Sequence, residues 1–456
     1  MTAPCTPDSS AAMNGTTDID INDLLDDRPA EQVFRVHRDA YTDPHVFERE
    51  QQDIFESTWV FVGLANQLPR PHDFFTVTLG RQPVIVSRNG DGEIRCLLNS
   101  CRHRGMVVCP QRSGNRKTHT CRYHGWVYGS GGENMFVTDQ AEGRYPAWFA
   151  KDNHDLVPVA RFGNYRGFLF ASLSPDVPPL ETHLGDARFF LDLILDQAPQ
   201  GLEYVPGDIR YTFNANWKLQ IENSLDMYHF ASTHASYVEL LARRKPDAFA
   251  GGMPPSPADA AEQGTFSFGR GHAVMWRGKS RASPELLARR RAGYVADISE
   301  LRAKWAGSAR NVTIFPNLQI VDNVTSVMLR VLHPLAVDKT EMHTHCLAPV
   351  GEDADLRAAR IRDYEDFFNP SGLATPDDNV IYEHSQAGFK AMAAGWTAGH
   401  LRGINPEGAP AANKYAQELG LTNADWSLGS RALGDETCFH DAYREWRRLL
   451  TQHRPG

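Results

Sequence analysis

The chain has 456 residues, of which 41% are hydrophobic and 23% charged, and its formal net charge is −9. This length can bury a large core and predicts roughly two to three domains, while the acidic balance is unlike the basic surfaces of nucleic-acid-binding proteins. No apolar run reaches the roughly 18 residues that a membrane-spanning helix needs. We therefore expect neither a nucleic-acid partner nor a membrane span.

The N-terminal segment is predicted to be a disordered tail. Residues 1–33 are polar and acidic, and they lack the basic and apolar regions of a secretory signal. The chain's seven cysteines are scattered and odd in number, which does not suit a disulfide framework. These features predict a cytoplasmic protein.

A β-rich region follows a short helix. Residues 45–60 have the pattern of a helix running into a strand, and apolar and polar residues then alternate around "NGDG" at 89–92, a hairpin signal. After a buried strand at 166–173, the Pro-rich stretch "SPDVPPL" marks a boundary. We place the first domain at 34–178.

Two loops of this domain each hold one Cys and one His, in the patterns Cys101-x-His103 and Cys121-x-x-His124. Structural zinc sites of the Cys2His2 type usually take both cysteines from one knuckle and both histidines from a helix. A Rieske [2Fe–2S] cluster needs two thiolates on one iron and two imidazoles on the other. Two loop tips that each offer one cysteine and one histidine meet that demand. The pattern therefore favours a Rieske cluster over a zinc site or unligated core residues.

The chain continues for about 280 residues beyond this domain, which a simple electron carrier would not need. Residues 179–456 begin with an amphipathic helix and a strand-to-helix segment. Several strands follow, then helices at about 353–368 and 376–393, and a helix closes the chain. We place the second domain at 179–456.

A candidate metal site lies in "NWKLQIENSLDMYHFASTHAS", residues 216–236. Asp226 and His229 are three residues apart and so share one helix face. His234 is five residues beyond His229, roughly 140° around an ideal helix. Both histidines can bind one metal only if the helix ends or distorts near residues 232–233.

A carboxylate ligand would complete a 2-His-1-carboxylate site, which holds Fe(II) and leaves positions open for O2 and substrate. Asp377, Asp378 and Glu383 are the candidates, and Thr375 is expected to cap the helix that carries them. Because carboxylates in a first turn also stabilise the helix dipole, spacing alone does not choose among the three.

Together these motifs resemble the large subunits of Rieske non-haem iron aromatic-ring-hydroxylating oxygenases, and most closely the benzoate, toluate, anthranilate and 2-halobenzoate 1,2-dioxygenases. The similarity runs from about residue 34 and includes "GRQPVIVSR", "NWKLQIEN", "HPLAVDKTE" and "RIRDYEDFFNPSGLATPDD". The resemblance implies an α+β fold, with a β-rich Rieske domain and a helix-grip catalytic domain in which an antiparallel sheet grips a long helix.

The resemblance also implies roles for individual residues. Ligands of the [2Fe–2S] cluster would be Cys101, His103, Cys121 and His124. Ligands of a mononuclear Fe(II) would be His229, His234 and Asp378, with Asp226 as a bridging carboxylate and Asn223 close to the iron.

The same resemblance implies a reaction and partners. The expected reaction is cis-dihydroxylation of an aromatic ring, that of a substituted benzoate, with O2 and with electrons from NADH delivered by a flavin and iron–sulfur reductase. The expected assembly is a trimeric core, α3 or α3β3 with a small beta subunit, in which His124 of one chain hydrogen-bonds Asp226 of the next.

Several readings stay open. Met227 and Phe230 depart from the benzoate group and belong either to the core or to the substrate pocket, while Arg270 and Arg277 are candidates to pair with a substrate carboxylate. A Rieske monooxygenase, such as a salicylate-type hydroxylase or a demethylase, would use the same metal sites. The chain could also be an electron carrier without oxygenase activity or a zinc-stabilised binding protein. In either case the pattern of Asp226, His229, His234 and Asp378 would be a coincidence.

Overall fold

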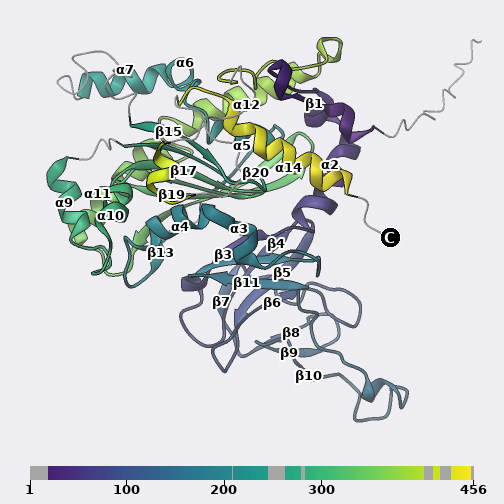
Figure 1. Ribbon diagram of the computed structural model, residues 1–456. Coiled ribbons are helices and arrows are strands. Elements are labelled where there is room, and N and C mark those ends of the chain that lie inside the picture. Colours follow the sequence, from purple (N-terminus) through teal and green to yellow (C-terminus); the bar gives the residue numbers. More distant parts are fainter. Residues whose placement is uncertain are drawn as a thin grey trace, which may run out of the picture.

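The computed structural model describes residues 19–207, 209–244, 262–278, 283–404, 414–421 and 433–452. The chain forms a smaller β-rich body and a larger body built around a wide antiparallel sheet (Figure 1). The predicted α+β fold is therefore confirmed. None of the helices within the described ranges is both long and apolar enough to cross a membrane.

The N-terminal segment packs on the larger body. It contains η1 (Ile21–Leu24), β1 (Leu25–Arg28), η2 (Pro29–Glu31), β2 (Val33–Val36), α1 (Asp39–Thr42), α2 (Pro44–Glu50) and η3 (Gln51–Phe55). β1 and β2 pair antiparallel, and Ile21, Leu24 and Phe34 are buried in one cluster with the C-terminal helix α14 (His440–Thr451). The predicted tail is therefore wrong for residues 19–33, while residues 1–18 lie outside the described ranges. The reason is a packing partner some 400 residues away along the chain, which local composition does not reveal.

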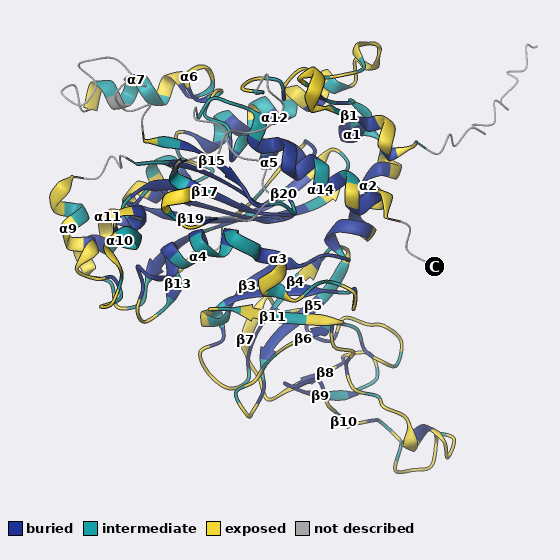
Figure 2. Cartoon of the chain, in the orientation of Figure 1, coloured by how far each residue is buried: buried dark blue, intermediate teal, exposed yellow. Residues whose placement is uncertain are grey.

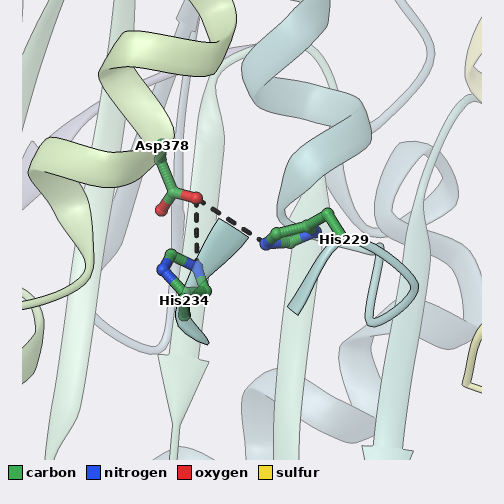
Figure 3. Close-up of side chains that lie close together, drawn as sticks. All are labelled: His229, His234 and Asp378. Atoms are coloured by element: carbon green, nitrogen blue, oxygen red, sulfur yellow. Dashed lines mark ion pairs between the residues drawn. The ribbon is translucent and has the colours of Figure 1, made fainter. Parts of the chain in front are cut away.

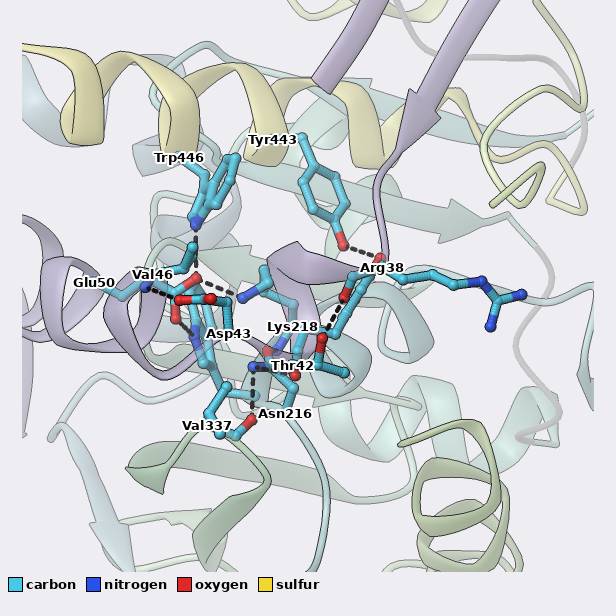
Figure 4. Close-up of polar contacts among 12 residues, drawn as sticks. Arg38, Thr42, Asp43, Val46, Glu50, Asn216, Lys218, Val337, Tyr443 and Trp446 are labelled. Atoms are coloured by element: carbon cyan, nitrogen blue, oxygen red, sulfur yellow. Dashed lines mark hydrogen bonds and ion pairs between the residues drawn. The ribbon is translucent and has the colours of Figure 1, made fainter. Parts of the chain in front are cut away.

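A buried charge network fastens α2 to the larger body (Figure 4). The fully buried carboxylate of Glu50 accepts hydrogen bonds from Lys218 Nζ at 2.5 Å, from the Trp217 indole at 2.8 Å and from the Trp446 indole at 2.7 Å. Burial lowers the pKa of Lys218, and the charge of Glu50 opposes that shift. Because these contacts join the N-terminal segment to α14, we propose that residues 19–55 belong with the second domain rather than with the Rieske domain.

The smaller body consists of short strands: β3 (Val60–Leu64), β4 (Asp73–Leu79), β5 (Gln82–Arg88), β6 (Ile94–Leu98), β7 (Ser113–Asn115), β8 (Thr118–Thr120), β9 (Val127–Gly129), β10 (Asn134–Phe136), β11 (Arg161–Tyr165) and β12 (Phe168–Ser172). They form sheets in the orders β6-β5-β4-β7, β10-β9-β8 and β11-β12-β3. The "NGDG" stretch connects β5 to β6, which pair antiparallel, so the predicted hairpin is confirmed.

The larger body is built on one antiparallel sheet in the order β13-β20-β19-β18-β17-β16-β15, with β14 also paired to β20. Its strands are β13 (Leu202–Tyr204), β14 (Ile209–Phe213), β15 (Gln263–Ser267), β16 (Ala273–Arg277), β17 (Ala309–Ile314), β18 (Leu318–Asp322), β19 (Val327–Ala336) and β20 (Lys339–Pro349). Figure 2 shows these strands as a mostly buried layer.

Helices cover both faces of this sheet. They are α3 (Leu180–Leu184), α4 (Arg188–Leu195), α5 (Trp217–Asn223), α6 (Phe230–Thr233), α7 (Ala235–Arg244), α9 (Pro284–Arg291), α10 (Glu300–Ala306), α11 (Ala354–Phe367), α12 (Thr375–Phe389) and α13 (Lys414–Glu418). In Figure 1, α5, α12 and α14 lie on one side of the sheet, and α3 and α4 lie on the side that faces the smaller body.

Alternation along the strands assigns side chains to these two faces. Leu329 and Val331 of β19 are buried in the cluster that contains α4, whereas Leu332 and its strand neighbour Met342 are buried in the cluster that contains α5 and α14. The α5 face therefore receives every second residue of each strand, and this is the face that carries the second candidate site.

Candidate metal centres

The two Cys/His loops share one backbone conformation. In each, the cysteine N–H donates to the carbonyl five residues later at 2.8 Å. The glycine four residues after the cysteine donates back to the cysteine carbonyl, at 2.8 Å for Gly105 and 3.0 Å for Gly125. Both glycines have a positive φ, 73° and 74°, which a residue with a side chain rarely adopts. One loop follows β6 and the other joins β8 to β9, so the fold presents two matched tips.

The four predicted cluster ligands meet between these tips. The rings of His103 and His124 lie 4.4 Å apart, and Cys101 and Cys121 are buried. Burial raises the pKa of the Cys121 thiol, and the neighbouring Cys101 raises it further. Within the described chain, the buried Nδ1 of His103 has no hydrogen-bond partner, so its lone pair is available to a metal. Two thiols facing two imidazoles fit a Rieske cluster.

The surroundings of the cluster site are polar toward one sulfur and aromatic toward one imidazole. The hydroxyl of Tyr128 lies 3.3 Å from Cys101 Sγ and accepts the N–H of Arg102 at 3.0 Å, so its own hydrogen is free to point at the sulfur. The Trp126 ring stacks on His103 with an interplanar angle of 4°. Such contacts orient ligands and stabilise negative charge on sulfur.

The second site forms where the chain leaves and re-enters helix. α5 ends at Asn223, a turn carries Asp226, and the short α6 ends at Thr233. His234 then has non-helical angles, φ −102° and ψ 31°, before α7 begins. The predicted helix end near residues 232–233 is confirmed, and it turns His234 toward the same space as His229.

His229, His234 and Asp378 converge there (Figure 3). Asp378 Oδ1 lies 3.6 Å from His229 Nε2 and 3.2 Å from His234 Nε2, and one ligand atom from each residue lies within 4.8 Å of the others. Burial lowers the pKa of His234, but hydrogen bonds to Asp378 and Asp377 more than compensate and raise it overall. Two imidazoles and one carboxylate around one point are a donor set that suits Fe(II).

The structure also separates the three carboxylate candidates. Asp378 is buried against both histidines, whereas Asp377 Oδ2 lies 3.4 Å from the far nitrogen, Nδ1, of His234. Glu383 accepts hydrogen bonds from the backbone and side-chain nitrogens of Asn214, at 2.8 and 3.0 Å, and so is engaged elsewhere.

The predicted cap of α12 is wrong. Thr375 is the first helical residue, and Ala374 holds the cap position without a side-chain hydrogen bond. The Thr375 hydroxyl donates instead to the Phe368 carbonyl at 2.9 Å, near the end of α11, because the turn between the two helices is tight enough to bring that acceptor closer.

Two polar side chains orient the histidine and carboxylate. Asp226 Oδ2 accepts from His229 Nδ1 at 3.1 Å, which directs Nε2 toward Asp378. The Asn223 side-chain nitrogen lies 3.1 Å from Asp378 Oδ1 and 3.2 Å from His229 Nε2, so it sits between two predicted ligands. The Asp226 side chain keeps 23% of its surface exposed, more than the half-buried His229 and the buried His234 and Asp378.

The remaining predicted residues fall into different places. The Phe230 ring is buried beside His234 at 5.2 Å, and Met227 packs against the core cluster around α14. Arg270 lies in the turn between β15 and β16, and Arg277 ends β16. The sequence analysis did not single out Arg330, which is a buried charge in β19; its signal is the single charge in the apolar run "SVMLRVL".

Comparison with known proteins gives matches over both bodies. Residues 58–147 match the Rieske [2Fe-2S] domain, and residues 203–448 match the catalytic domain of the ring hydroxylating alpha subunit. The toluate 1,2-dioxygenase alpha subunit of Pseudomonas putida is 41% identical over 81% of this chain and 82% of its own length. The 2-halobenzoate 1,2-dioxygenase large subunit of Burkholderia cepacia is 37% identical over 93% and 91%. The crystal structure of naphthalene 1,2-dioxygenase from Rhodococcus sp. bound to indole superposes with a TM-score of 0.78 at 26% identity, covering 92% of this chain and 95% of that one.

Proposed function

Because this chain belongs to the family of Rieske ring-hydroxylating oxygenase alpha subunits, we propose that it is the terminal component that cis-dihydroxylates the ring of a substituted benzoate. The two relatives above are named for toluate and 2-halobenzoate, which are both substituted benzoates. The reaction takes O2 and electrons from NADH, which a flavin and iron–sulfur reductase delivers. A cytoplasmic location is part of this proposal.

One observation carries the proposal: a Cys/His pair of loops and a 2-His-1-carboxylate set occur in one chain. A carrier of single electrons needs only the first site, so the convergence of His229, His234 and Asp378 counts against a carrier or a zinc-stabilised binding protein. These three residues would hold a mononuclear iron, and Cys101, Cys121, His103 and His124 would hold the cluster. When bound, the iron supplies the positions at which O2 is activated beside the substrate.

The residues around the iron ligands have supporting tasks. Asp226 holds His229 with Nε2 toward the iron, and Asn223 restrains the Asp378 carboxylate by its side-chain hydrogen bond. Burial of His234 and Asp378 keeps bulk water from this side of the site. The chain therefore supplies a preorganised, largely dry set of donors.

The two sites lie at opposite ends of one chain. In Figure 1 the loops beside β8 and β9 are at the far end of the smaller body, while α5, α6 and α12 lie on the far side of the larger sheet. Electron transfer within one chain would have to cross the whole sheet. We therefore propose a trimeric core, α3 or α3β3 with a small beta subunit, in which His124 of one chain meets the partly exposed Asp226 of the next.

A single turnover tests this function. The purified protein is fully reduced without oxygen, mixed with benzoate and its amino, hydroxy, halo and methyl derivatives, and then exposed to 18O2. Two labelled oxygen atoms in a product are the expected result, and they also identify the substrate. One labelled atom would replace the proposal with a Rieske monooxygenase. If no benzoate gives a product, the proposed substrate class is wrong.

A further inference from the structure

Arg330 is a buried cation without an anion. It lies in the middle of β19 and is 6% exposed. The other buried arginines of the described chain all have acceptors: Arg310 pairs with Asp322, Arg360 with Glu352, and Arg290 donates to the Thr325 carbonyl. Within the same ranges Arg330 forms neither an ion pair nor a hydrogen bond, and its buried Nε has no partner. Leaving a charge desolvated and unpaired is strongly unfavourable, so the position calls for an anionic ligand.

Strand register places Arg330 on the face that carries the iron site. Gln319, Arg330 and Thr344 lie side by side on β18, β19 and β20. The outer two are satisfied by helices on that face: Gln319 exchanges hydrogen bonds with Gln220 of α5, and Thr344 accepts from Tyr364 of α11 at 3.1 Å. Arg330 is thus the unsatisfied member of a polar row beneath α5, α11 and α12.

The helix that carries the predicted iron ligand Asp378 packs on the same face of the sheet as this arginine, because Tyr382 of α12 is buried in one cluster with Leu332 and Met342. Tyr382 follows Asp378 by one turn of α12, so both side chains leave the helix on one face, and both are buried. Burial raises the pKa of Tyr382 well above its usual value, the charge of Asp378 raises it further, and the charge of Arg330 lowers it. The same two charges act on Tyr211 of β14. Strand register gives the matching geometry: Tyr211 pairs with Met342 and Arg330 pairs with Thr344, two residues further along β20, while the Tyr382 ring lies 5.1 Å from that of Phe213 on β14.

We propose that Arg330 binds the carboxylate of the aromatic substrate and so holds the ring against the iron ligands. This inference rests on the proposed function and adds the residue that makes the site select an acid. A guanidinium matches a carboxylate with two parallel hydrogen bonds, and the pair is strongest when it is shielded from water. A neutral arene would leave the buried charge unpaired, which gives the site a reason to reject it.

The test compares acid and amide binding to the purified full-length protein. Dissociation constants are measured without oxygen by calorimetry for benzoate, 2-aminobenzoate, 2-chlorobenzoate and 3-methylbenzoate, and for the amide of each. The variants are Arg330→Gln, Arg330→Lys and, as a control on the surface of α9, Arg289→Gln. Cluster absorbance and iron content are recorded for each protein, since they report folding and metal loss separately from binding.

Arg330→Gln should weaken binding of the acids about 10- to 100-fold, because a charge-assisted contact is lost. Binding of the amides should change less than about threefold, Arg330→Lys should be intermediate because a lysine keeps the charge but not the planar fork, and Arg289→Gln should match the wild type. A collapse of folding in Arg330→Gln would appear as lost cluster absorbance, and the comparison of acid with amide would then rest on Arg330→Lys.

Three results would overturn the inference. In the first, Arg330→Gln binds the acids as tightly as the wild type does. In the second, its affinities for the acids and the amides fall equally. In the third, it loses iron but keeps the cluster, which would make Arg330 a counter-charge for Asp378. Arg270→Gln and Arg277→Gln test the two arginines that the sequence analysis proposed for this role. If either of them, and not Arg330→Gln, loses binding of the acids alone, the assignment of Arg330 is wrong. If the wild type binds none of the acids, the proposed function fails with the inference; if it binds and converts them while Arg330→Gln does so equally well, only the inference fails.

Discussion

Asp377 is expected to strengthen iron binding without touching the metal. Its Oδ2 lies 3.4 Å from His234 Nδ1, on the side of the imidazole opposite Asp378. A carboxylate there fixes the tautomer that presents Nε2 as a ligand and increases its basicity. Loss of such outer partners typically costs 10- to 100-fold in metal affinity. Because the contact is long and 34% of the Asp377 side chain is exposed, we expect Asp377→Asn to weaken iron binding by about 10-fold, or ~1.4 kcal/mol.

The assay is competition between the protein and a ferrous chelator, with iron counted per chain after equilibration. The cluster is an internal reference, because its four predicted ligands lie in the other body of the molecule and its absorbance should not change. Asp363→Asn, an exposed residue on α11, is the matched control. If Asp377→Asn retains as much iron as the wild type, the reasoning is refuted. If it loses iron completely, as Asp378→Ala should, Asp377 is itself a ligand and the reasoning is also refuted.

Three further substitutions probe other parts of the molecule. Asp226→Ala should keep the cluster, weaken iron binding about 10-fold because Asp226 orients His229, and lose reductase-driven turnover even when excess Fe(II) keeps the site filled; near-normal turnover would exclude Asp226 from the electron path. Glu50→Gln leaves Lys218 buried without its counter-charge and should lower the free energy of unfolding by about 3–5 kcal/mol in urea titrations, with an unchanged midpoint contradicting this. Burial, with Glu445 beside it, raises the pKa of Asp441 to about 7, so ionisation opposes folding and stability falls as pH rises from about 4 to about 7. Asp441→Asn should remove that fall, and parallel stability curves for the two proteins would show the shift to be absent.

The convergence of the four predicted cluster ligands could be anticipated from the sequence because the pattern is local. Each loop contains its own Cys, His and Gly within five residues, and the two loops are separated by fewer than twenty. The spacing of residues within each short loop is therefore enough to predict which cysteine and which histidine lie at its tip. The positive φ of Gly105 and Gly125 belongs to the same local requirement.

The carboxylate of the second candidate site could be only partly predicted, because its position depends on how helix α12 is rotated against the sheet. Two adjacent aspartates in one first turn are equivalent by spacing, and their separation appears only when α12 packs against the sheet. Asp378 then points with Tyr382 into the buried side, while Asp377 reaches the outer nitrogen of His234. The predicted cap at Thr375 failed for a related reason, since its acceptor belongs to the preceding helix.

Long-range packing accounts for the other errors and omissions. The segment 19–33 looked disordered because its few apolar residues find their partners on α14, at the other end of the chain. The local sequence does not distinguish Arg330 from an ordinary strand residue. Its neighbours Gln319 and Thr344, on the two adjacent strands, have side-chain hydrogen-bond partners, and this becomes apparent only in the folded chain. A buried charge without a partner can be recognised only after the hydrogen-bond partners of all neighbouring polar groups have been identified.

Exposed side chains give a physical reason for the proposed trimer. Around the cluster tip, Met106, Val107 and Tyr123 are exposed, Tyr123 by 55%, although the Tyr123 ring stacks on His124. At the other site Tyr228 is 58% exposed, and its N–H donates to Asp226. Each end of the proposed electron path thus has an exposed surface with one aromatic ring, and at the second of these surfaces Arg402 of the same chain stacks on the Tyr228 ring at 3.9 Å. Pairing the two surfaces between neighbouring chains would bury both and exclude water from the His124–Asp226 contact, which is the condition under which that hydrogen bond is strongest.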